Sequence, residues 1–473
     1  MELSPAQEQA MDAFTKKQNM FLTGPGGTGK TALIKKMVEH CKTVGLRVQV
    51  CALTGCASIL LNCQAKTVHS WAGIGLANGY ADLIVNKVAG HKRKASNWKK
   101  IDVLIIDEVS MMSQKIFEIL DGIGRKVRKA TGHLPFGGLQ IVFSGDFYQL
   151  PPVARDDNFQ EDDLSSAFCF ESPQWNNTFS VIIQLTKIFR QTDQAYTKVL
   201  NQIRVGRLTK SAYELLLPHI GKTLPETFKP TILLPRRRDV ELINAAEFIK
   251  LVGEEKIYKL SEADAPPVQQ AQQIQVVLQQ AQAAGDSPIL LPPSYYNTAL
   301  PMPTMQHISP EQREMEYNLL VNSIMADKEI ILKKGTQVMC IANIDMESPE
   351  PIVNGSQGIV IDFVGGFPLV QFNNGAKRVV GYHTWSSEMS PSIGVKQIPL
   401  IYAWAITIHK AQGVSLDMAQ IDAGSNIFEC GQTYVALSRI KSLDGLYLTA
   451  FNPQKIKVNK KVQEFYASIV AVA

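Results

Sequence analysis

The chain has 473 residues, of which 45% are hydrophobic and 19% are charged, with 48 Lys and Arg against 43 Asp and Glu. This length exceeds what one hydrophobic core usually serves, so we expect about two to four globular domains, and the apolar content excludes a disordered chain. The formal net charge of +5 suits a phosphate-bearing partner but does not require one.

Cysteine usage and the N-terminal segment bear on the compartment. The seven cysteines are scattered and form no C-x-x-C pair, which indicates a reduced compartment and argues against a structural metal. The N-terminal segment MELSPAQEQAMDAFTKK resembles neither a signal nor a transit peptide, and no stretch approaches the roughly 20 apolar residues of a membrane span. We therefore expect an intracellular protein that begins at or near Met1 and has no targeting or transmembrane segment.

The first third of the chain alternates strand-like and helix-like segments. Short apolar runs at 20–24, 48–54 and 103–106 are typical of buried strands, whereas 31–45 has the periodicity of an amphipathic helix. A further apolar run follows at 139–146. This alternation predicts an α/β fold with a parallel sheet flanked by helices.

The rest of the chain indicates a second α/β unit that carries an insert. Strand-like runs occur at 231–235 and again from Pro399 onwards. Between Ala265 and Leu300 the only charged residue is Asp286, so we expect a solvated loop there, with a Gln/Ala-rich helix over 269–284. Short strand patterns punctuated by Gly and Asn predict a small antiparallel barrel at about 333–395.

A glycine-rich loop separates the first predicted strand from the first predicted helix. Its sequence, GPGGTGKT, fits G-x-x-x-x-G-K-[ST]. In such a loop the backbone N–H groups face phosphates, the lysine reaches the β- and γ-phosphates, and the threonine hydroxyl binds Mg²⁺. A chance match is the alternative, but strand, loop and helix all stand in register. We expect ATP to bind here through Gly24, Pro25, Gly26, Gly27, Thr28, Gly29, Lys30 and Thr31.

Two carboxylates end the strand predicted at 103–106. Asp107 is expected to hold Mg²⁺ through water, and Glu108 to orient and deprotonate the water that attacks ATP. An Asp–Glu pair at a strand end is often merely solvated or caps a helix. The prediction therefore depends on the pairing of these carboxylates with the phosphate loop.

The segment SGDFYQLPPV favours a motor over a switch ATPase or a kinase, which would share the first two motifs. An apolar strand ends there in Gly145 and Asp146, and Gln149 follows in a turn stiffened by Pro151 and Pro152. A side-chain amide in this place can sense the γ-phosphate on one side and nucleic acid on the other. Gln149 is thus the candidate coupling residue.

Twelve blocks together carry a family resemblance: LSPAQEQA, GPGGTGKT, ALTGCASILL, TVHSWAGIG, LIIDEVSMM, PFGGLQIVFSGDFYQLPPV, LTKIFRQ, LINAAEFIKL, LKKGTQVM, VNGSQGIV, AWAITIHKAQGVSL and YVALSRIKSLDGL. In this order they resemble the petite-integration-frequency (PIF-one) family of superfamily-one DNA helicases, in the RecD/Dda-like branch. The resemblance thins only at 75–100 and 260–330. It implies an ATP hydrolase that moves 5′→3′ on single-stranded DNA and unwinds duplex, with roles in DNA replication, repair and recombination.

The resemblance also implies a domain plan with two RecA-like P-loop NTPase domains and ATP in the cleft between them. The first domain, 1A, is expected at 1–189, with a small wedge subdomain, 1B, inserted at about 72–100. The second, 2A, is expected at 190–258 and 396–473. The inserted domain 2B, 259–395, is expected to combine a flexible Gln/Ala/Pro-rich stretch, 262–310, with an SH3-like β-barrel at about 333–395. Little lies outside this motor, so the chain resembles the minimal helicase cores of phages and large DNA viruses.

Several residues take roles only through the resemblance. Gln7 would read the adenine, and Arg190 and Arg439 would reach the γ-phosphate from the second domain, where a planar guanidinium suits developing charge. Without the family motifs, an exposed glutamine and arginines in surface ion pairs are the alternatives. The basic segment HKRKASNWKK, His91 to Lys100, falls in the expected wedge, and a solvated basic loop is the other interpretation.

DNA contacts are expected from blocks that do not handle ATP. Hydroxyl, imidazole and ammonium groups can hold phosphates without reading sequence, as a motor requires. Stacking of a tryptophan on a base is worth about 1–3 kcal/mol, although a core position is equally compatible with the apolar context of Trp71. The expected contacts are Thr54, Thr67, His69, Trp71, Thr407, His409 and Lys410.

The expected ligands are ATP and Mg²⁺, and the expected partners are single-stranded DNA, duplex or forked DNA and possible RNA–DNA hybrids, with no membrane. We expect a monomeric motor in a DNA-containing compartment, either the nucleus or a cytoplasmic viral replication site. Three alternatives remain: a helicase on RNA or on a hybrid, a DNA-binding scaffold with a vestigial ATPase, and a RecD-like recombination subunit that needs a nuclease partner. The complete set of phosphate-handling residues argues against the scaffold.

Overall fold

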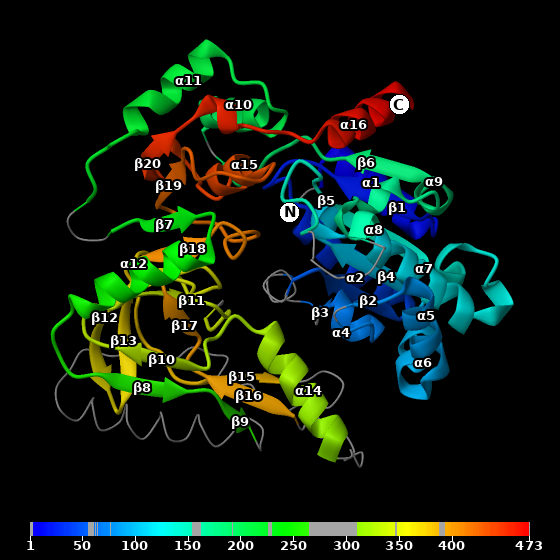
Figure 1. Cartoon of the computed structure of the whole chain (residues 1–473), viewed down its shortest axis with the longest axis horizontal. Coiled ribbons are helices and arrows are strands. Elements are labelled where there is room, and N and C mark those ends of the chain that lie inside the picture. The colour runs from blue at the N-terminus through cyan, green and yellow to red at the C-terminus, as the bar shows by residue number, and fades with distance from the viewer. Residues whose placement is uncertain are drawn as a thin grey trace. The chain divides into compact units, whose positions relative to one another are not determined.

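The computed structural model of the chain describes residues 3–54, 61, 63, 65–75, 77–153, 162–191, 193–225, 229–263, 310–345, 348–386 and 393–472. These residues form two compact units (Figure 1). The first unit comprises 1–223 together with 421–473, and the second comprises 224–420.

A six-stranded parallel sheet forms the centre of the first unit. Every pair of neighbouring strands in it is parallel. The carboxyl ends of the strands therefore share one edge of the sheet, and the candidate site residues follow these ends. This confirms the parallel sheet that the sequence predicts. In spatial order the strands are β3 (Lys66–Thr67), β2 (Val48–Ala52), β4 (Val103–Asp107), β5 (Gln140–Gly145), β1 (Met20–Thr23) and β6 (Val181–Gln184).

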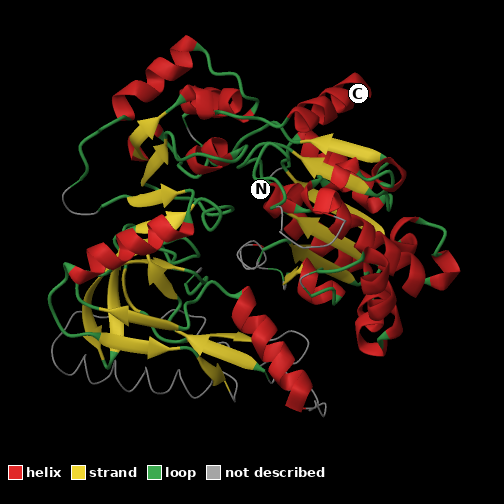
Figure 2. Cartoon of the chain, viewed as in Figure 1, coloured by secondary structure: helices red, strands yellow, loops and turns green. Residues whose placement is uncertain are grey.

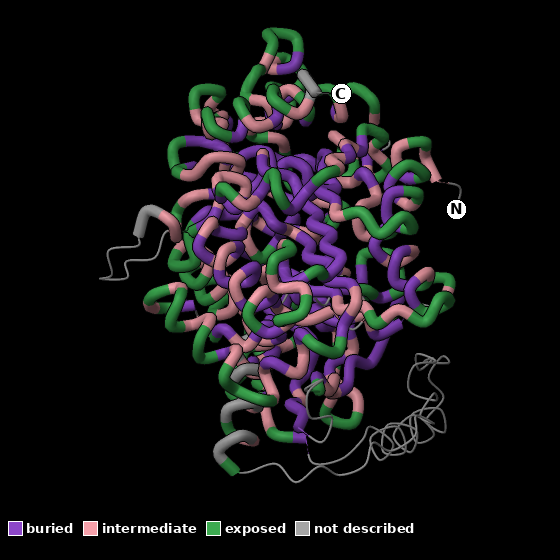
Figure 3. The backbone as a smooth tube through the Cα atoms, turned by 90° about the vertical axis from the view of Figure 1, so that its right-hand side faces the viewer, coloured by how far each residue is buried: buried purple, intermediate pink, exposed green. Residues whose placement is uncertain are grey.

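Successive side chains of each strand enter two different cores, one on each face of the sheet. Along β4, Leu104 and Ile106 belong to one cluster, whereas Val103 and Ile105 belong to the other. This alternation follows from the pleat of a strand. It explains why the strands read as continuous apolar runs. In Figure 3 buried stretches (purple) run through the interior, and exposed ones (green) lie mostly at turns and outer helices.

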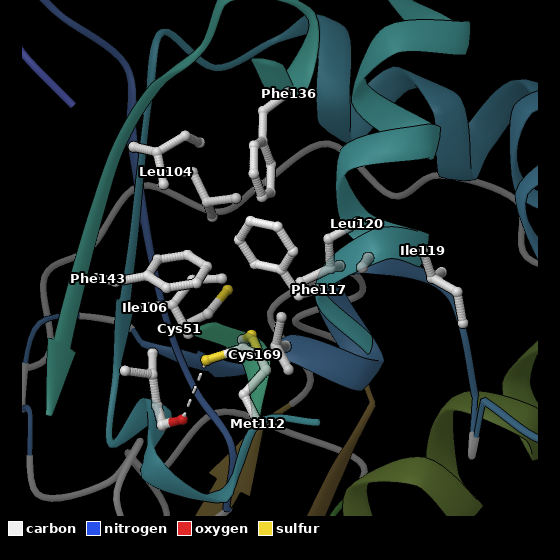
Figure 4. Packing of buried hydrophobic residues seen from close by; sticks show 14 of the residues in the cluster. Cys51, Leu104, Ile106, Met112, Phe117, Ile119, Leu120, Phe136, Phe143 and Cys169 are labelled. Carbon is white, nitrogen blue, oxygen red and sulfur yellow. Dashed lines mark hydrogen bonds between the residues drawn. The ribbon is translucent and has the colours of Figure 1, made fainter. Parts of the chain in front are cut away.

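Helices α1 (Pro5–Thr15) and α2 (Lys30–Val44) cover one face of the sheet, and α7 (Gln114–Val127) contributes to the other. The ring of Phe117 on α7 lies 5.5 Å from that of Phe136 and 5.8 Å from that of Phe143 (Figure 4). Gly124 permits this packing, because a Cβ there would lie 2.5 Å from the carbonyl oxygen of Phe136. Helix α7 is therefore pressed closely against the turn that precedes β5.

The region of the expected wedge consists of two helices, α5 (Ala81–Gly90) and α6 (Lys92–Lys99), of which α5 packs on α7. The basic run at 91–100 thus forms a helix and not a solvated loop. Trp98 anchors it, since this residue is fully buried and its ring lies 4.7 Å from that of Trp71 on α4 (Val68–Ala72).

Six further helices belong to the described part of the first unit, and all but α10 and α16 are short. They are α8 (Asp162–Ser166), α9 (Trp175–Thr178), α10 (Gln194–Arg204), α11 (Lys210–Leu216), α15 (Gln432–Leu437) and α16 (Lys460–Val472). Strand β20 (Leu446–Phe451) belongs to this unit, and β19 (Ala419–Ala423) spans the boundary at 421. Single 3-10 turns lie at Val109–Met111, Lys129–Thr131, Pro135–Gly138, Cys169–Glu171, Leu217–His219, Leu443–Gly445 and Pro453–Lys455.

The second unit is mainly antiparallel, and its strands appear in yellow in Figure 2. One sheet orders β14 (Lys377–Val379), β13 (Phe367–Phe372), β12 (Gln357–Val364), β11 (Gln337–Cys340) and β17 (Leu400–Tyr402). A second orders β15 (His383–Ser386), β16 (Gly394–Gln397) and β9 (Ser261–Ala263), and β10 (Glu329–Leu332) pairs with β8 (Lys256–Lys259). Parallel strands β7 (Thr231–Leu234) and β18 (Ala405–Thr407) and helices α12 (Arg237–Ile249) and α14 (Pro310–Ser323) complete it.

The predicted strands within 333–395 are all present, but strands outside this range join them. Strand β9, which precedes the Gln/Ala/Pro-rich stretch, pairs with β16, and β17, which begins after 395, pairs with β11. Strands β8 and β10, on either side of the stretch, pair with each other in a separate two-stranded sheet. Most of the stretch, including the helix expected over 269–284, lies outside the described residues. In the part of the chain that the structure describes, no helix has the length and apolar character needed to cross a membrane.

Candidate nucleotide site and nucleic-acid contacts

The loop between β1 and α2 has a backbone that glycine adopts readily. Gly24, Gly27 and Gly29 have φ angles of 142°, 83° and 82°, a region that disfavours a side chain. A Cβ on Gly27 would also lie 2.5 Å from the Cβ of Arg190. Helix α2 begins at Lys30 directly after this loop, so its unpaired N–H groups border it and favour an anion.

The side chain of Lys30 folds back onto the glycine-rich loop that precedes α2. Its Nζ donates hydrogen bonds to the carbonyl oxygens of Gly24 at 2.7 Å and Pro25 at 3.0 Å. Burial lowers the pKa of Lys30, and three carboxylates oppose this shift. These carboxylates are Asp107 and Glu108 at the end of β4 and Asp146 directly after β5.

The two carboxylates after β4 differ in their surroundings. Asp107 is buried, and its pKa is raised by burial first and by the charge of Glu108 second. Glu108 has a left-handed backbone, with φ 55° and ψ 42°, which is uncommon for a residue other than glycine and is typical of functional sites. A buried acid beside a second negative charge is a position that a divalent cation would stabilise, and Thr31 in the first turn of α2 carries a hydroxyl, the kind of hard oxygen that such a cation prefers. The donor set thus fits Mg²⁺.

Two arginines converge on the phosphate loop. A Cβ built on Gly26 would lie 3.5 Å from Nη2 of Arg439 and 3.6 Å from Nη1 of Arg190. Arg190 Nη1 also donates to the Ser438 carbonyl oxygen at 3.3 Å, and Arg439 Nε donates to the Val435 carbonyl oxygen at 2.9 Å. The pKa of Arg439 is lowered by burial and, next, by the charge of Arg190. Two cations held this close favour an anion beside them.

Tyr434 also reaches the loop, although it is not among the residues predicted from the sequence. Its Oη accepts a hydrogen bond from the backbone N–H of Gly26 at 2.9 Å. Tyr434 lies on α15, which begins after Gly431, and a Cβ on Gly431 would lie 2.5 Å from the carbonyl oxygen of Gln149. Tyr434 begins the block YVALSRIKSLDGL, which also contains the predicted Arg439.

The predicted adenine ligand lies beside the same loop. Gln7 is buried, its Nε2 donates to the Thr28 carbonyl oxygen at 3.4 Å, and its Oε1 accepts from the Ser4 N–H at 3.0 Å. A Cβ on Gly29 would lie 2.8 Å from Gln7 Nε2 and 3.7 Å from the ring of Phe189. Phe189 is an exposed aromatic ring that no sequence pattern indicated.

The turn after β5 is held by a buried ion pair. The Arg204 guanidinium donates to both carboxylate oxygens of Asp146 at 2.8 Å each, and neither side chain is more than 7% exposed. Gln149 is buried in this turn, and its N–H donates to the Asp146 carbonyl oxygen at 2.8 Å. No local sequence pattern marks Arg204, because it lies on α10, far along the chain from Asp146.

The expected DNA contacts of the first unit fall into two groups. Thr54 and His69 line one pocket of about 240 Å³, together with Ser113, Ser165 and the buried Lys115. Thr67 caps α4, and its hydroxyl accepts from the Ser70 N–H at 3.4 Å. Among the described residues that line this pocket, Lys115 is the one with an ammonium group, and the sequence patterns did not indicate it.

Trp71 requires a correction. Its side chain is 2% exposed, belongs to the hydrophobic core and packs against Trp98. A ring buried in this way has no free face for a base, so the expected stacking on DNA does not fit the structure. The apolar context SWAGIGL reflects a core position.

The other expected DNA contacts lie in the second unit. Thr407 ends β18, and its hydroxyl accepts from the Lys410 N–H at 3.1 Å. His409 is partly buried and Lys410 is exposed. These three residues therefore form one turn that begins where a parallel strand ends, which is where such sheets bind ligands.

Comparison with known proteins gives consistent matches. The family model for PIF1-like helicases matches residues 2–213. The chain is 31% identical over 471 residues to the ATP-dependent DNA helicase PIF1 of Danio rerio, covering 98% of this chain and 64% of that protein. It is also 31% identical over 469 residues to the ATP-dependent DNA helicase Pif1 of Bdellovibrio bacteriovorus, covering 98% and 92%. The chain thus spans somewhat less than two thirds of the Danio rerio relative.

Solved structures show the same fold. The Pif1 of a Bacteroides species in complex with ADP-AlF4 matches with a TM-score of 0.76 and 27% identity, covering 100% of this chain and 98% of that one. The Bacteroides Pif1 in complex with ADP-AlF3 and single-stranded DNA matches with a TM-score of 0.64 and 27% identity, covering 100% and 98%. The α/β fold with parallel sheets and antiparallel insertions is therefore that of these structures.

Proposed function

Since the chain belongs to the PIF1-like helicase family, we propose that it is an ATP-dependent DNA helicase, which moves 5′→3′ on single-stranded DNA and unwinds the duplex. The observation that carries the proposal is the convergence of Lys30, Arg190 and Arg439 on one phosphate loop. The relatives are ATP-dependent DNA helicases, and similar structures hold an ADP complex with single-stranded DNA.

The proposed ATP site follows from the loop geometry. The backbone N–H groups of 24–31 would hold the α- and β-phosphates, and Lys30 would exchange its carbonyl partners for the β- and γ-phosphates. The Gln7 amide would pair with the adenine edge, as it already lies beside Gly29. The exposed ring of Phe189 is well placed to cover a face of the base.

Mg²⁺ would be held by Thr31 directly and by Asp107 through water. The ion would neutralise charge on the β- and γ-phosphates when it is bound. The raised pKa of Asp107 supports this assignment, because burial beside Glu108 disfavours its charge until a cation is present. Glu108, one residue further on, would orient the attacking water and take its proton.

Arg190 and Arg439 would stabilise the charge that develops on the γ-phosphate. Both guanidinium groups lie close to Gly26 in the phosphate loop, and both have a lowered pKa through burial, so an anion between them would restore favourable charge pairing. Gln149 would relay the state of the phosphate to the DNA. The backbone of its turn passes close to Gly431, where a Cβ would lie 2.5 Å from the Gln149 carbonyl oxygen.

For DNA we propose backbone contacts from Thr54, Thr67 and His69 in the first unit and from Thr407, His409 and Lys410 in the second. Trp71 is left out because it is buried. Opening one base-pair step costs about 1.4 kcal/mol on average, so one ATP per step is ample energy. Alternating grip by two sets of contacts, driven by the arginines, would give direction to the movement.

We further propose the domain plan of the family for this chain: RecA-like domains at 1–189 and at 190–258 with 396–473, a wedge at about 72–100, and the inserted domain 259–395 with its SH3-like barrel. A monomeric motor in a DNA-containing compartment fits these parts. The helices α5 and α6 and the antiparallel strands around 333–395 support the two insertions.

Nucleic-acid specificity of the ATPase tests the proposal. We would measure steady-state hydrolysis of ATP with Mg²⁺, alone and with matched DNA or RNA oligonucleotides, and repeat the DNA reaction with EDTA. The proposal expects strong stimulation by single-stranded DNA and loss of activity in EDTA. Equal or greater stimulation by RNA would support an RNA helicase instead, and hydrolysis that nucleic acid does not change would contradict the proposal.

A further inference from the structure

A tyrosine on helix α16 connects the two strand ends that border the phosphate loop. The Oη of Tyr466 lies 2.6 Å from the hydroxyl oxygen of Thr23, 3.2 Å from the backbone nitrogen of Phe147 and 3.4 Å from Oδ1 of Asp146. Thr23 ends β1 directly before Gly24, whereas Asp146 and Phe147 directly follow β5. One hydroxyl group therefore reaches both the start of the loop and the turn beside it.

The hydrogen bonds of this hydroxyl are consistent with one another. A tyrosine hydroxyl has one proton to donate and two lone pairs to accept. An ionised Asp146 can only accept, so Tyr466 donates to it and accepts from the Thr23 hydroxyl and the Phe147 N–H. Burial raises the pKa of Tyr466 far above its usual range. The group stays protonated, and its hydrogen-bonding capacity is fully used.

The ring of Tyr466 is held separately from its hydroxyl. It stacks on the ring of Tyr148 with a centroid distance of 4.7 Å and an interplanar angle of 11°. The Arg204 guanidinium lies over both rings, 4.5 Å from Tyr148 and 5.4 Å from Tyr466. Tyr466 and Val462 are buried in the core cluster. A phenylalanine at 466 would keep these contacts and lose only the hydroxyl.

We propose that Tyr466 is a positioning residue of the nucleotide site: its hydroxyl fixes the start of the phosphate loop relative to the turn that carries Gln149. The inference rests on the proposed function, in which both segments serve the γ-phosphate. The backbone pairing of β1 with β5 ends at Thr23 and Gly145, so the hydroxyl bridges the two segments just beyond the last paired residues. Without the hydroxyl the loop and the turn lose this anchor, and misplacement of reacting groups by about 1 Å costs up to about 100-fold in rate. Tyr466 itself touches no phosphate and acts through Thr23 and the turn.

The test is Tyr466→Phe in the full chain, with kcat and KM for ATP measured at saturating single-stranded DNA. We expect kcat to fall by about tenfold, with the Kd for single-stranded DNA unchanged within about twofold. Tyr258→Phe is the matched control. Tyr258 donates to the carbonyl oxygen of Gly366 at 2.7 Å in the second unit, so it loses a comparable bond and should keep the wild-type kcat.

A second variant, Thr23→Val, removes the same hydrogen bond from the other side and leaves α16 intact. If Tyr466 acts through Thr23, Thr23→Val lowers kcat to a similar extent, and the double variant is little worse than either single variant. Additive effects, a kcat within twofold of wild type, or a fall no larger than that of Tyr258→Phe would overturn the inference. Should Tyr466→Phe not fold, Thr23→Val alone decides. A wild-type chain without DNA-stimulated hydrolysis would instead overturn the proposed function.

Discussion

At the scale of single residues, Glu108 has a strained backbone at the end of strand β4. Its left-handed backbone, φ 55°, is strained for a residue with a side chain, by about 1–3 kcal/mol. The neighbouring strand adds constraint, because a Cβ on Gly145 would lie 3.0 Å from the backbone nitrogen of Val109. The proposed role of Glu108 as the general base would account for a carboxylate in this strained position.

Glu108→Gln should therefore retain the fold and nucleotide binding but lower ATP hydrolysis by about 100-fold or more, since a general base contributes 10²–10⁴-fold. Lys30→Ala should abolish hydrolysis by removing the charge that meets the phosphates. Steady-state ATPase assays and anisotropy with a labelled oligonucleotide check both, and single-strand binding should be unchanged. If Glu108→Gln kept most of the activity, the assignment of the base would be wrong.

The Asp146–Arg204 pair gives a second prediction at this scale. Arg204→Ala leaves a buried carboxylate without its bidentate partner, so we expect a loss of about 3–5 kcal/mol in the free energy of unfolding. Arg237→Ala is the control, because its ion pair with Glu241 is exposed and should be worth at most about 1 kcal/mol. Urea denaturation measures the free energy of unfolding of both variants. Similar small losses in the two would contradict a stabilising role for the buried Asp146–Arg204 pair.

Single residues also mark where prediction from sequence succeeds and fails. The phosphate loop and Asp107–Glu108 are local patterns, so spacing alone located them. Arg204 and Tyr466 meet Asp146 from distant parts of the chain, and no local pattern predicts such contacts. Trp71 was misassigned because burial against Trp98 depends on a helix that the sequence left ambiguous.

At the scale of elements, helix α7 packs so closely that two of its glycines should respond differently to the same change. A Cβ on Gly124 would lie 2.5 Å from the backbone of Phe136, whereas one on Gly122 would lie 3.1 Å from a methyl group of Val85. Gly124→Ala should therefore destabilise the fold by about 1–3 kcal/mol, despite a better helix propensity. Gly122→Ala should be close to neutral, because a side chain can adjust.

Thermal or urea unfolding of both variants tests this packing. Equal stability of the two would mean that α7 can shift away from the turn at Phe136, and the close approach described for the core cluster would be incorrect.

His383 on strand β15 should make the stability of the second unit sensitive to acid. Burial lowers the pKa of His383 to about 4, and its ring lies 4.7 Å from that of Trp385. In the unfolded chain a histidine titrates near pH 6.5. Between these values the unfolded state binds more protons, so stability falls as pH drops from about 6.5 to about 4.

Chemical denaturation at pH 7 and pH 5 measures this effect. We expect the wild type to lose about 1–2 kcal/mol over this interval and His383→Gln to lose measurably less. An identical loss in both proteins would assign the acid sensitivity to other groups.

At the scale of the whole molecule, the parallel sheet was predictable because its strands are continuous apolar runs linked by short helical segments. The antiparallel unit was predictable only in part. Strands 333–395 carry their own glycine turns, but β8 and β9 are short, lie before the Gln/Ala/Pro-rich stretch, and pair with β10 and β16 beyond it. Such long-range pairing leaves no local signal in the sequence, so the strand pattern at 333–395 did not indicate the pairing of β8 with β10 or of β9 with β16.

The direction of movement is the central claim for the molecule as a whole, and strand displacement measures it most directly. Purified chain with ATP and Mg²⁺ would be given matched duplexes that bear a single-stranded tail at either the 5′ or the 3′ end. The account predicts unwinding from the 5′ tail and none from the 3′ tail, with Lys30→Ala inactive on both. Unwinding from the 3′ tail alone would contradict it.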